Sequence, residues 1–184
     1  MANIALHKDN IVRTAMRLFR KQGYASTGLQ QILAESGAPK GSLYHYFPGG
    51  KEELGKAAVT LAGQLMGEML AGLAAKHEKP GPFVHAYCGV MAGWMEESEF
   101  RSGCPIATTM LETVPNSPLL TKVGQQILDH WISIIAPVYV RSGLSQADAK
   151  SKAELLIASM EGALLLARIR QDTSPIMAIA ERCT

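Results

Sequence analysis

The sequence predicts an all-α protein with two parts, a three-helix unit at the N-terminus and a larger helical unit behind it. Two observations carry this prediction. Residues 26–47 have the spacing of two short helices joined by a tight turn. Residues 51–76 and 145–167 carry apolar residues at helical spacing over the length of long helices. We therefore expect one domain at residues 1–50 and a second at residues 51–184.

Composition restricts the class of protein. Of the 184 residues, 47% are apolar and 18% are charged, which indicates a globular chain that can bury a core. The N-terminal residues show no signal-peptide pattern, and no apolar run is long enough to cross a membrane, so we expect a cytoplasmic protein. The three cysteines, Cys88, Cys104 and Cys183, are odd in number and lack metal-ligand spacing, which argues against a disulfide framework.

The first helix is expected to open at Asp9 or Asn10 and to end at Gly23. Its apolar residues recur at positions 11, 15, 18 and 19, the spacing of a helix with one buried face. Basic side chains occupy its other faces and form a flank that suits anionic groups such as phosphates: Arg13, Arg17, Arg20 and Lys21.

The next two helices have start and stop signals of their own. Thr27 and Gln30 fit a capping box at the start of the second helix. Gly37 can adopt the left-handed conformation that closes it. The third helix is expected over residues 39–47, about two turns, and ends before Pro48. This arrangement predicts a helix-turn-helix.

The outward face of the third helix has the chemistry of a surface that reads DNA. Leu43 and Phe47 fall on its inner side, and the remaining side chains are polar without a single acid. Carboxylates on such a face would oppose DNA phosphates. An ordinary solvent-exposed helix is the alternative, and two exposed tyrosines in three residues make it unattractive. The predicted DNA-binding residues are Thr27, Lys40, Gly41, Ser42, Tyr44, His45, Tyr46 and Lys51.

Residues 11–54, which end in GAPKGSLYHYFPGGKEEL, resemble the DNA-binding domain of the TetR family of transcriptional repressors. The segment GCPIATTMLE at residues 103–112 is similar to the LmrA and YxaF subgroup of that family. The resemblance implies a repressor with a C-terminal sensor domain. One departure is Pro39, which stands where the family often has a Ser or Thr cap and offers no side-chain acceptor.

The charge distribution agrees with a DNA-binding N-terminus. The whole chain has a formal charge of +2, but residues 1–56 hold eight basic and four acidic residues, a net +4. The remaining residues have a net charge of −2. Positive charge is therefore concentrated in the part that resembles a DNA reader.

Six further helices are expected after residue 50. A long helix begins at Lys51 and runs to about Lys76, where it is well placed to act as a lever. The seventh helix should bend at Pro137, and Ser145 should cap the eighth. The other expected helices span residues 83–97, 105–112 and 174–182, the sixth being stopped by Pro115.

The eighth helix is apolar on nearly all sides, so both of its faces need covering. Its charged residues, Glu154, Glu161 and Arg168, exclude a membrane span. A second copy of the chain is the expected cover, in a homodimer completed by the ninth helix. The predicted dimerisation residues are Leu156, Ser159, Met160, Gly162 and Ala163.

Residues 65–135 are rich in methionine and aromatic side chains with a few polar groups, which favours a pocket for a small hydrophobic or aromatic effector. Ordinary core packing is the alternative. The predicted ligand-binding residues are Met66, Met69, Tyr87, Met91, Trp94, Cys104, Thr108, Met110 and Trp131. Cys104 also precedes a helix N-terminus, where a thiol gains reactivity, so a thiol-based sensor of oxidants or electrophiles remains a second hypothesis.

No catalytic, metal or cofactor site is predicted. The five histidines show no pairing at helical spacing that would hold a metal, and no nucleophile has an adjacent base in the sequence. Two classes of function therefore remain. One is a ligand-responsive repressor of double-stranded operator DNA, and the other is an enzyme or carrier whose N-terminal helices merely pack. Salt-dependent, sequence-specific DNA binding would distinguish them.

Overall fold

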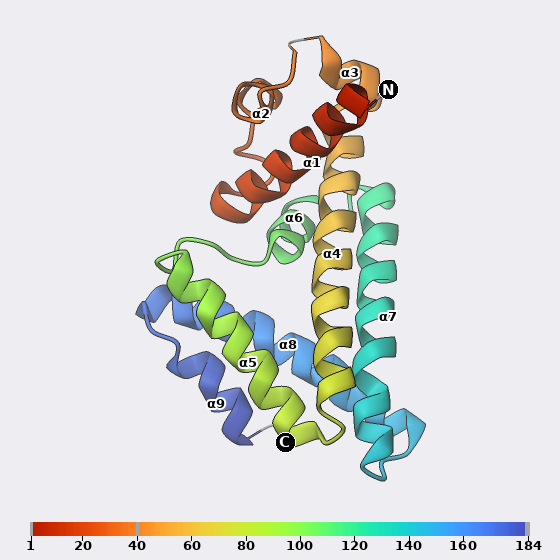
Figure 1. The fold of residues 1–184 in the computed structure, drawn as a ribbon, viewed down its shortest axis with the longest axis vertical. Helices are drawn as coiled ribbons and strands as arrows, with labels where there is room; N and C mark the ends of the chain where they lie inside the picture. Colours follow the sequence, from red (N-terminus) through yellow and green to blue (C-terminus); the bar gives the residue numbers. More distant parts are fainter. Residues whose placement is uncertain (1, 40, 183–184) are drawn as a thin grey trace. The chain divides into compact units, whose positions relative to one another are not determined.

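The computed structural model describes residues 2–39 and 41–182, and over these residues the chain forms nine α-helices and no strand (Figure 1). The predicted all-α fold class is confirmed. The helices are α1 (Ala2–Gln22), α2 (Leu29–Ser36), α3 (Ser42–Tyr46), α4 (Gly50–Lys76), α5 (Pro80–Glu97), α6 (Pro105–Thr113), α7 (Pro118–Arg141), α8 (Gln146–Arg170) and α9 (Ser174–Arg182).

The chain divides into two compact units that do not separate at residue 50. The first unit holds Met1–Gln64 and Pro105–Ile127, and the second holds Leu65–Cys104 and Leu128–Thr184. Both α4 and α7 contribute residues to the two units, because the boundaries after Gln64 and Ile127 fall inside these helices. The first unit therefore contains the helix-turn-helix together with α6 and the first half of α7.

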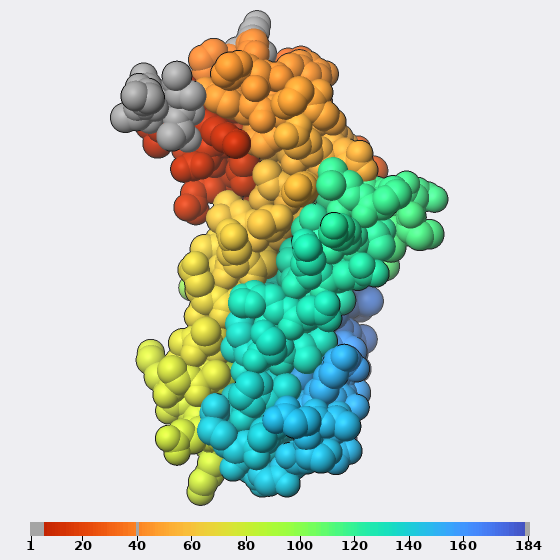
Figure 2. All heavy atoms as spheres, turned by 90° about the vertical axis from the view of Figure 1, so that its right-hand side faces the viewer, coloured from red at the N-terminus to blue at the C-terminus, as the bar shows by residue number. Residues whose placement is uncertain are grey.

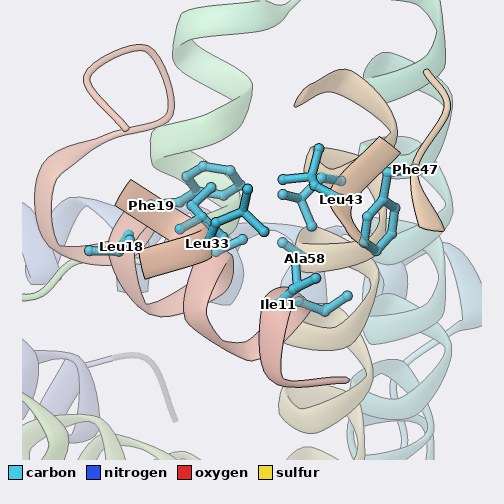
Figure 3. Close-up of a cluster of buried hydrophobic side chains, with 11 residues drawn as sticks. Ile11, Leu18, Phe19, Leu33, Leu43, Phe47 and Ala58 are labelled. Atoms are coloured by element: carbon cyan, nitrogen blue, oxygen red, sulfur yellow. The ribbon is translucent and has the colours of Figure 1, made fainter. Parts of the chain in front are cut away.

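The core of the first unit joins α1, α2, α3 and the start of α4. Phe19 of α1, Leu33 of α2 and Leu43 of α3 are buried in one cluster with Ala58 of α4 (Figure 3). Phe47, directly after α3, completes it and is 2% exposed. The apolar residues of four short segments thus share one core, which holds the two-turn helices that could not be stable alone.

Glycine lets α4 and α7 approach closely within the first unit. A Cβ atom at Gly63 of α4 would lie 2.7 Å from Cγ1 of Ile127 on α7. One turn earlier on α7, a Cβ atom at Gly124 would lie 2.9 Å from the sulfur of Met110 on α6. Figure 2 shows the first halves of α4 (orange to yellow) and α7 (green) side by side. Larger residues at these glycines would push the helices apart.

In the second unit, α5, α8 and α9 pack together (Figure 1). The buried face of α8 includes Leu156, Met160 and Ala167, each at most 1% exposed. Ser145 caps α8 as expected, since its hydroxyl accepts a hydrogen bond from the N–H of Asp148 at 3.1 Å. Pro137 lies inside α7, which continues past it to Arg141.

Several predicted helix ends differ from those in the structure. The first helix begins at Ala2, well before Asp9. The capping box at Thr27 is wrong: Gly28 is the N-cap of α2 without a side-chain bond, because the Thr27 hydroxyl donates instead to the carbonyl of Gly23 at 2.6 Å. The predicted third helix is too long, since α3 spans only five residues. Gly37 closes α2 at φ 67°, as expected.

Candidate nucleic-acid interface

The short helix α3 has one apolar side buried in the core and a polar side that is exposed. Leu43 is 1% exposed and fixes one side of the helix in the core, while Tyr44, one residue on, is 66% exposed. His45 is also exposed, and its ring lies 5.1 Å from the half-buried ring of Tyr46, edge to face. The described part of this face contains no carboxylate, as a surface that approaches phosphates requires.

Ser42 and Gly41 open α3 on the same surface. The Ser42 hydroxyl donates to the carbonyl of Pro39 at 2.7 Å, which orders the turn before the helix. Its oxygen keeps lone pairs for an outside donor. Gly41 is exposed and serves as the N-cap. Lys40, a predicted DNA contact, lies outside the described residues.

Thr27 does not belong to this exposed face. Its side chain is 0% exposed, and the hydroxyl is bonded to Gly23 inside the turn between α1 and α2. The structure therefore places it in the scaffold of the helix-turn-helix, where it cannot reach DNA through its side chain. The sequence pattern misled because a threonine before a helix serves either as a cap or as a turn residue.

Lys51, at the start of α4, is half-buried and bound to the turn between α1 and α2. Its Nζ donates to the carbonyl of Ala25 at 3.1 Å and lies 4.7 Å from the centre of the Tyr24 ring. Burial lowers the pKa of Lys51, and the nearby carboxylate of Glu112 acts in the opposite direction. An ammonium group has three donors, so one bond to a carbonyl leaves others for a phosphate.

Hydrogen bonds also tie α1 to α2. Arg17 pairs with Glu35 at 2.5 Å, and this bond is the largest cause of the lowered pKa of Glu35. Gln31 donates to Glu35 at 2.9 Å and accepts from Gln22 at 2.9 Å. Arg17 is thus engaged by a carboxylate, although we expected it near phosphates. These bonds join α1 and α2 at their exposed sides and were not foreseen, since Arg17 and Glu35 are 18 residues apart in sequence.

The predicted ligand-binding residues divide between the two units. Tyr87, Met91 and Trp131 are buried in the second unit, which also holds the half-buried Trp94. Met66, Met69 and Cys104 are half-buried residues of the same unit, whereas Thr108 and Met110 belong to the first. These positions place most of the set around the second unit's core.

Glu161 of α8 is a charged residue that the sequence reading did not include in this set. It is largely buried, and burial raises the pKa of its carboxyl. The Cys104 thiol donates a hydrogen bond to it, which opposes that rise. Burial is also the largest cause of the raised pKa of Tyr87, followed by the charge of Glu161. The second unit therefore contains a polar group made of the buried phenol of Tyr87 and the half-buried side chains of Glu161 and Cys104.

The predicted dimerisation residues fall on two different sides of α8. Leu156, Met160 and Ala163 are 1%, 1% and 5% exposed, so the chain itself already covers them. Gly162 is exposed and Ser159 half-buried. The opposite side of α8 carries an exposed apolar stripe at spacings of three and four residues, formed by Leu155, Ala158, Gly162, Leu165, Leu166 and Ile169.

Metal and membrane sites find no support among the described residues. No group of three or more metal-binding side chains comes together in the described chain. By length and composition, α4 could cross a membrane, a test that the core helix of a globular protein also passes. Leu54 and Leu70 of α4 are both fully buried, so part of its apolar surface packs within the chain.

A helix-turn-helix on a buried scaffold, with an acid-free outer face and a separate helical unit, defines a DNA-binding regulator. Comparison with known proteins gives the particular family. Residues 11–58 match the tetR family of bacterial regulatory proteins, and residues 80–182 match the C-terminal domain of LmrA/YxaF-like transcriptional regulators. The chain belongs to the TetR family of transcriptional regulators.

Individual relatives support the assignment over nearly the whole chain. The regulator YxaF of Bacillus subtilis is 34% identical over 175 residues, which cover 95% of this chain and 92% of that protein. LmrA of the same organism is 32% identical, with 94% and 92% covered. A TetR regulator from Chloroflexus aurantiacus has a TM-score of 0.83 at 30% identity, covering 100% of this chain and 94% of its own. These relatives are regulators, which confirms the prediction that the chain is not an enzyme.

Proposed function

We propose that the protein is a repressor that binds a palindromic operator as a homodimer and releases it when a small hydrophobic or aromatic molecule binds the second unit. The observation that carries the proposal is the exposed, acid-free face of α3, backed by the buried Leu43 and Phe47. Groups on this face would contact base edges, which carry sequence information, while Lys51 would contact a phosphate. Such a protein acts where the DNA is, in the cytoplasm.

The exposed stripe on α8 supports the homodimer. Leu155, Leu165 and Ile169 are 56%, 60% and 68% exposed, and Gly162 between them allows another helix to come close. A stripe of this size on an isolated chain is costly in water, whereas a second copy would bury it against itself through a two-fold axis. The same axis would present two α3 helices to successive major grooves, which is why the operator should be palindromic.

The second unit is the proposed effector site. Its methionines and tryptophans suit a hydrophobic or aromatic molecule, and Glu161 and Tyr87 would supply polar anchors. The chain passes between the units three times, within α4, before α6 and within α7. A shift of these segments on ligand binding would change the separation of the two α3 helices, and rigid DNA would then fit poorly.

Two linked experiments test the proposal. The first selects duplexes from a random DNA pool with the purified protein and measures affinity at several salt concentrations. The second titrates a compound found by thermal-shift screening, with and without the selected duplex, by tryptophan fluorescence. A coupling of about 1–3 kcal/mol would weaken each ligand roughly 5- to 150-fold in the presence of the other. An unchanged ligand affinity would refute the mechanism of release.

The position of the half-buried Cys104 directly before the N-terminus of α6 keeps a thiol-based sensor as the second candidate function. In that case an electrophile or oxidant would modify Cys104, and the modification would replace the ligand as the signal. A Cys104→Ser variant separates the two hypotheses. Full response to the screened compound in this variant would exclude the thiol sensor.

A further inference from the structure

The turn between α1 and α2 is held by side chains from two other helices of the first unit. The N–H of Ala25 donates to the carboxylate of Glu112 on α6. The carbonyl of Ala25 accepts from Nζ of Lys51 on α4 at 3.1 Å. Both backbone polar groups of one turn residue are therefore bound by charged groups, an anion on the donor and a cation on the acceptor.

Gly23 makes room for this contact. A Cβ atom at Gly23 would lie 2.5 Å from Oε1 of Glu112, closer than real Cβ contacts come. The backbone there has φ +90°, a conformation that residues with side chains rarely adopt. Glycine at this position thus serves both the turn and the approach of the carboxylate.

Lys51 and Tyr24 complete the group on the α4 side. The ammonium lies 4.7 Å from the centre of the Tyr24 ring. The ring in turn packs against α4, since Cε2 of Tyr24 is 2.9 Å from where a Cβ of Gly55 would be. Burial lowers the pKa of Lys51, and the negative charge of Glu112 favours its charged form. Glu112 and Lys51 therefore hold the same residue of the turn, one from α6 and the other from α4.

We propose that Glu112 is a positioning residue for DNA binding, which fixes the α1–α2 turn and so the angle at which α2 and α3 are presented. The proposal rests on the DNA-binding role given above. Because α2 starts at Leu29, four residues after Ala25, a change in the turn moves the whole helix-turn-helix. Without Glu112, the N–H of Ala25 loses its acceptor and Lys51 its neighbouring negative charge.

The sign of the effect makes the proposal testable. Removing a carboxylate from a DNA-binding unit strengthens DNA binding by charge alone, because the carboxylate repels phosphates. A positioning role predicts the opposite. We expect Glu112→Ala to weaken binding to the selected duplex by up to about fivefold, the limit set by one intramolecular hydrogen bond of about 1 kcal/mol that pre-organises the turn. Glu112→Gln retains an acceptor and should recover part of the loss.

The experiment measures duplex affinity for Glu112→Ala, Glu112→Gln and Gly23→Ala, with Asp9→Asn as a matched control. Asp9 is an exposed acid of the same unit, so its loss should leave affinity unchanged or raise it. Melting temperatures report on folding. The amide proton shift of Ala25, measured by NMR, should move upfield in Glu112→Ala, because the hydrogen bond to a carboxylate is gone.

Weaker binding with a moved Ala25 signal, partly restored in Glu112→Gln, would support the proposal. Gly23→Ala combined with Glu112→Ala should then cost little more than Gly23→Ala alone, since Gly23→Ala removes the same contact and strains the turn as well. Equal or tighter binding by Glu112→Ala would overturn it, while leaving the proposed function intact if the wild type binds. A wild type that binds no duplex would instead refute the proposed function, and an unmoved Ala25 signal would refute the contact itself.

Discussion

Neighbouring residues of α3 should separate folding from DNA reading. Leu43 is 1% exposed within the core of the first unit, and Tyr44 is 66% exposed. Leu43→Ala removes roughly three methylene equivalents, about 2.4 kcal/mol at about 0.8 kcal/mol each. The cavity adds to this, so we expect a loss of about 3–4 kcal/mol in the free energy of unfolding.

Tyr44→Ala should leave stability within about 0.5 kcal/mol, because an exposed ring contributes little packing. Its effect should appear in DNA binding, as a loss of about 1–3 kcal/mol on the selected duplex and much less on a scrambled one.

Urea unfolding followed by circular dichroism measures the stability of both variants, and fluorescence anisotropy measures their affinity for both duplexes. Both measurements are needed because Leu43→Ala could lose DNA binding merely by unfolding. The assignment of Tyr44 to an exposed, DNA-reading face fails if Tyr44→Ala destabilises the protein as much as Leu43→Ala does. It also fails if Tyr44→Ala weakens both duplexes equally, since the exposed face of α3 would then only position the protein.

Three further predictions concern the dimer, a buried acid and a phosphate contact. Leu165→Glu on the exposed stripe of α8 should give a monomer in analytical ultracentrifugation and lose operator binding. Lys152→Glu, exposed beside the stripe, should do neither. A monomeric Leu165→Glu variant that binds the operator with full affinity would contradict the proposal that the protein binds DNA as a dimer. Burial raises the pKa of Glu161, so the stabilising contribution of its carboxyl is present at low pH and is lost as pH rises through that pKa. The melting temperature of Glu161→Gln minus that of the wild type should therefore increase from about pH 4 to about pH 8. A difference that stays constant with pH would contradict this. Lys51→Ala should reduce the salt slope of binding by about one, and an unchanged slope would exclude the phosphate contact.

The helices were predictable because their signals are local. Gly37 ends α2 in the left-handed conformation, and Ser145 caps α8, as their residue types predict. The inner positions of α3 followed from spacing alone, since Leu43 and Phe47 recur at i and i+4 and both are buried. Periodicity identifies a buried face whenever a helix has one polar side and one apolar side.

Periodicity could not say which apolar face of α8 meets the rest of the chain. Leu156 and Leu165 are chemically equivalent, yet the first is buried within the protomer and the second is exposed. Small residues led to Ala163 as a partner contact, although α8 uses that side for its own unit. A helix that is apolar on all sides has two faces that can pack, and only tertiary packing decides which face stays exposed for a partner chain.

The contacts around the α1–α2 turn were beyond sequence reasoning for a different reason. Glu112 and Ala25 are 87 residues apart, and the acceptor is matched to a backbone N–H, which every residue except proline possesses. The residue type at position 25 could therefore not indicate that its N–H binds Glu112. Gly23 was readable as the end of a helix, but its second role, to leave space for a carboxylate, depends on α6 being folded against α1. The residues that orient the DNA-binding surface, such as Glu112, thus depend on long-range packing, whereas the residues of the surface itself could be predicted from local sequence.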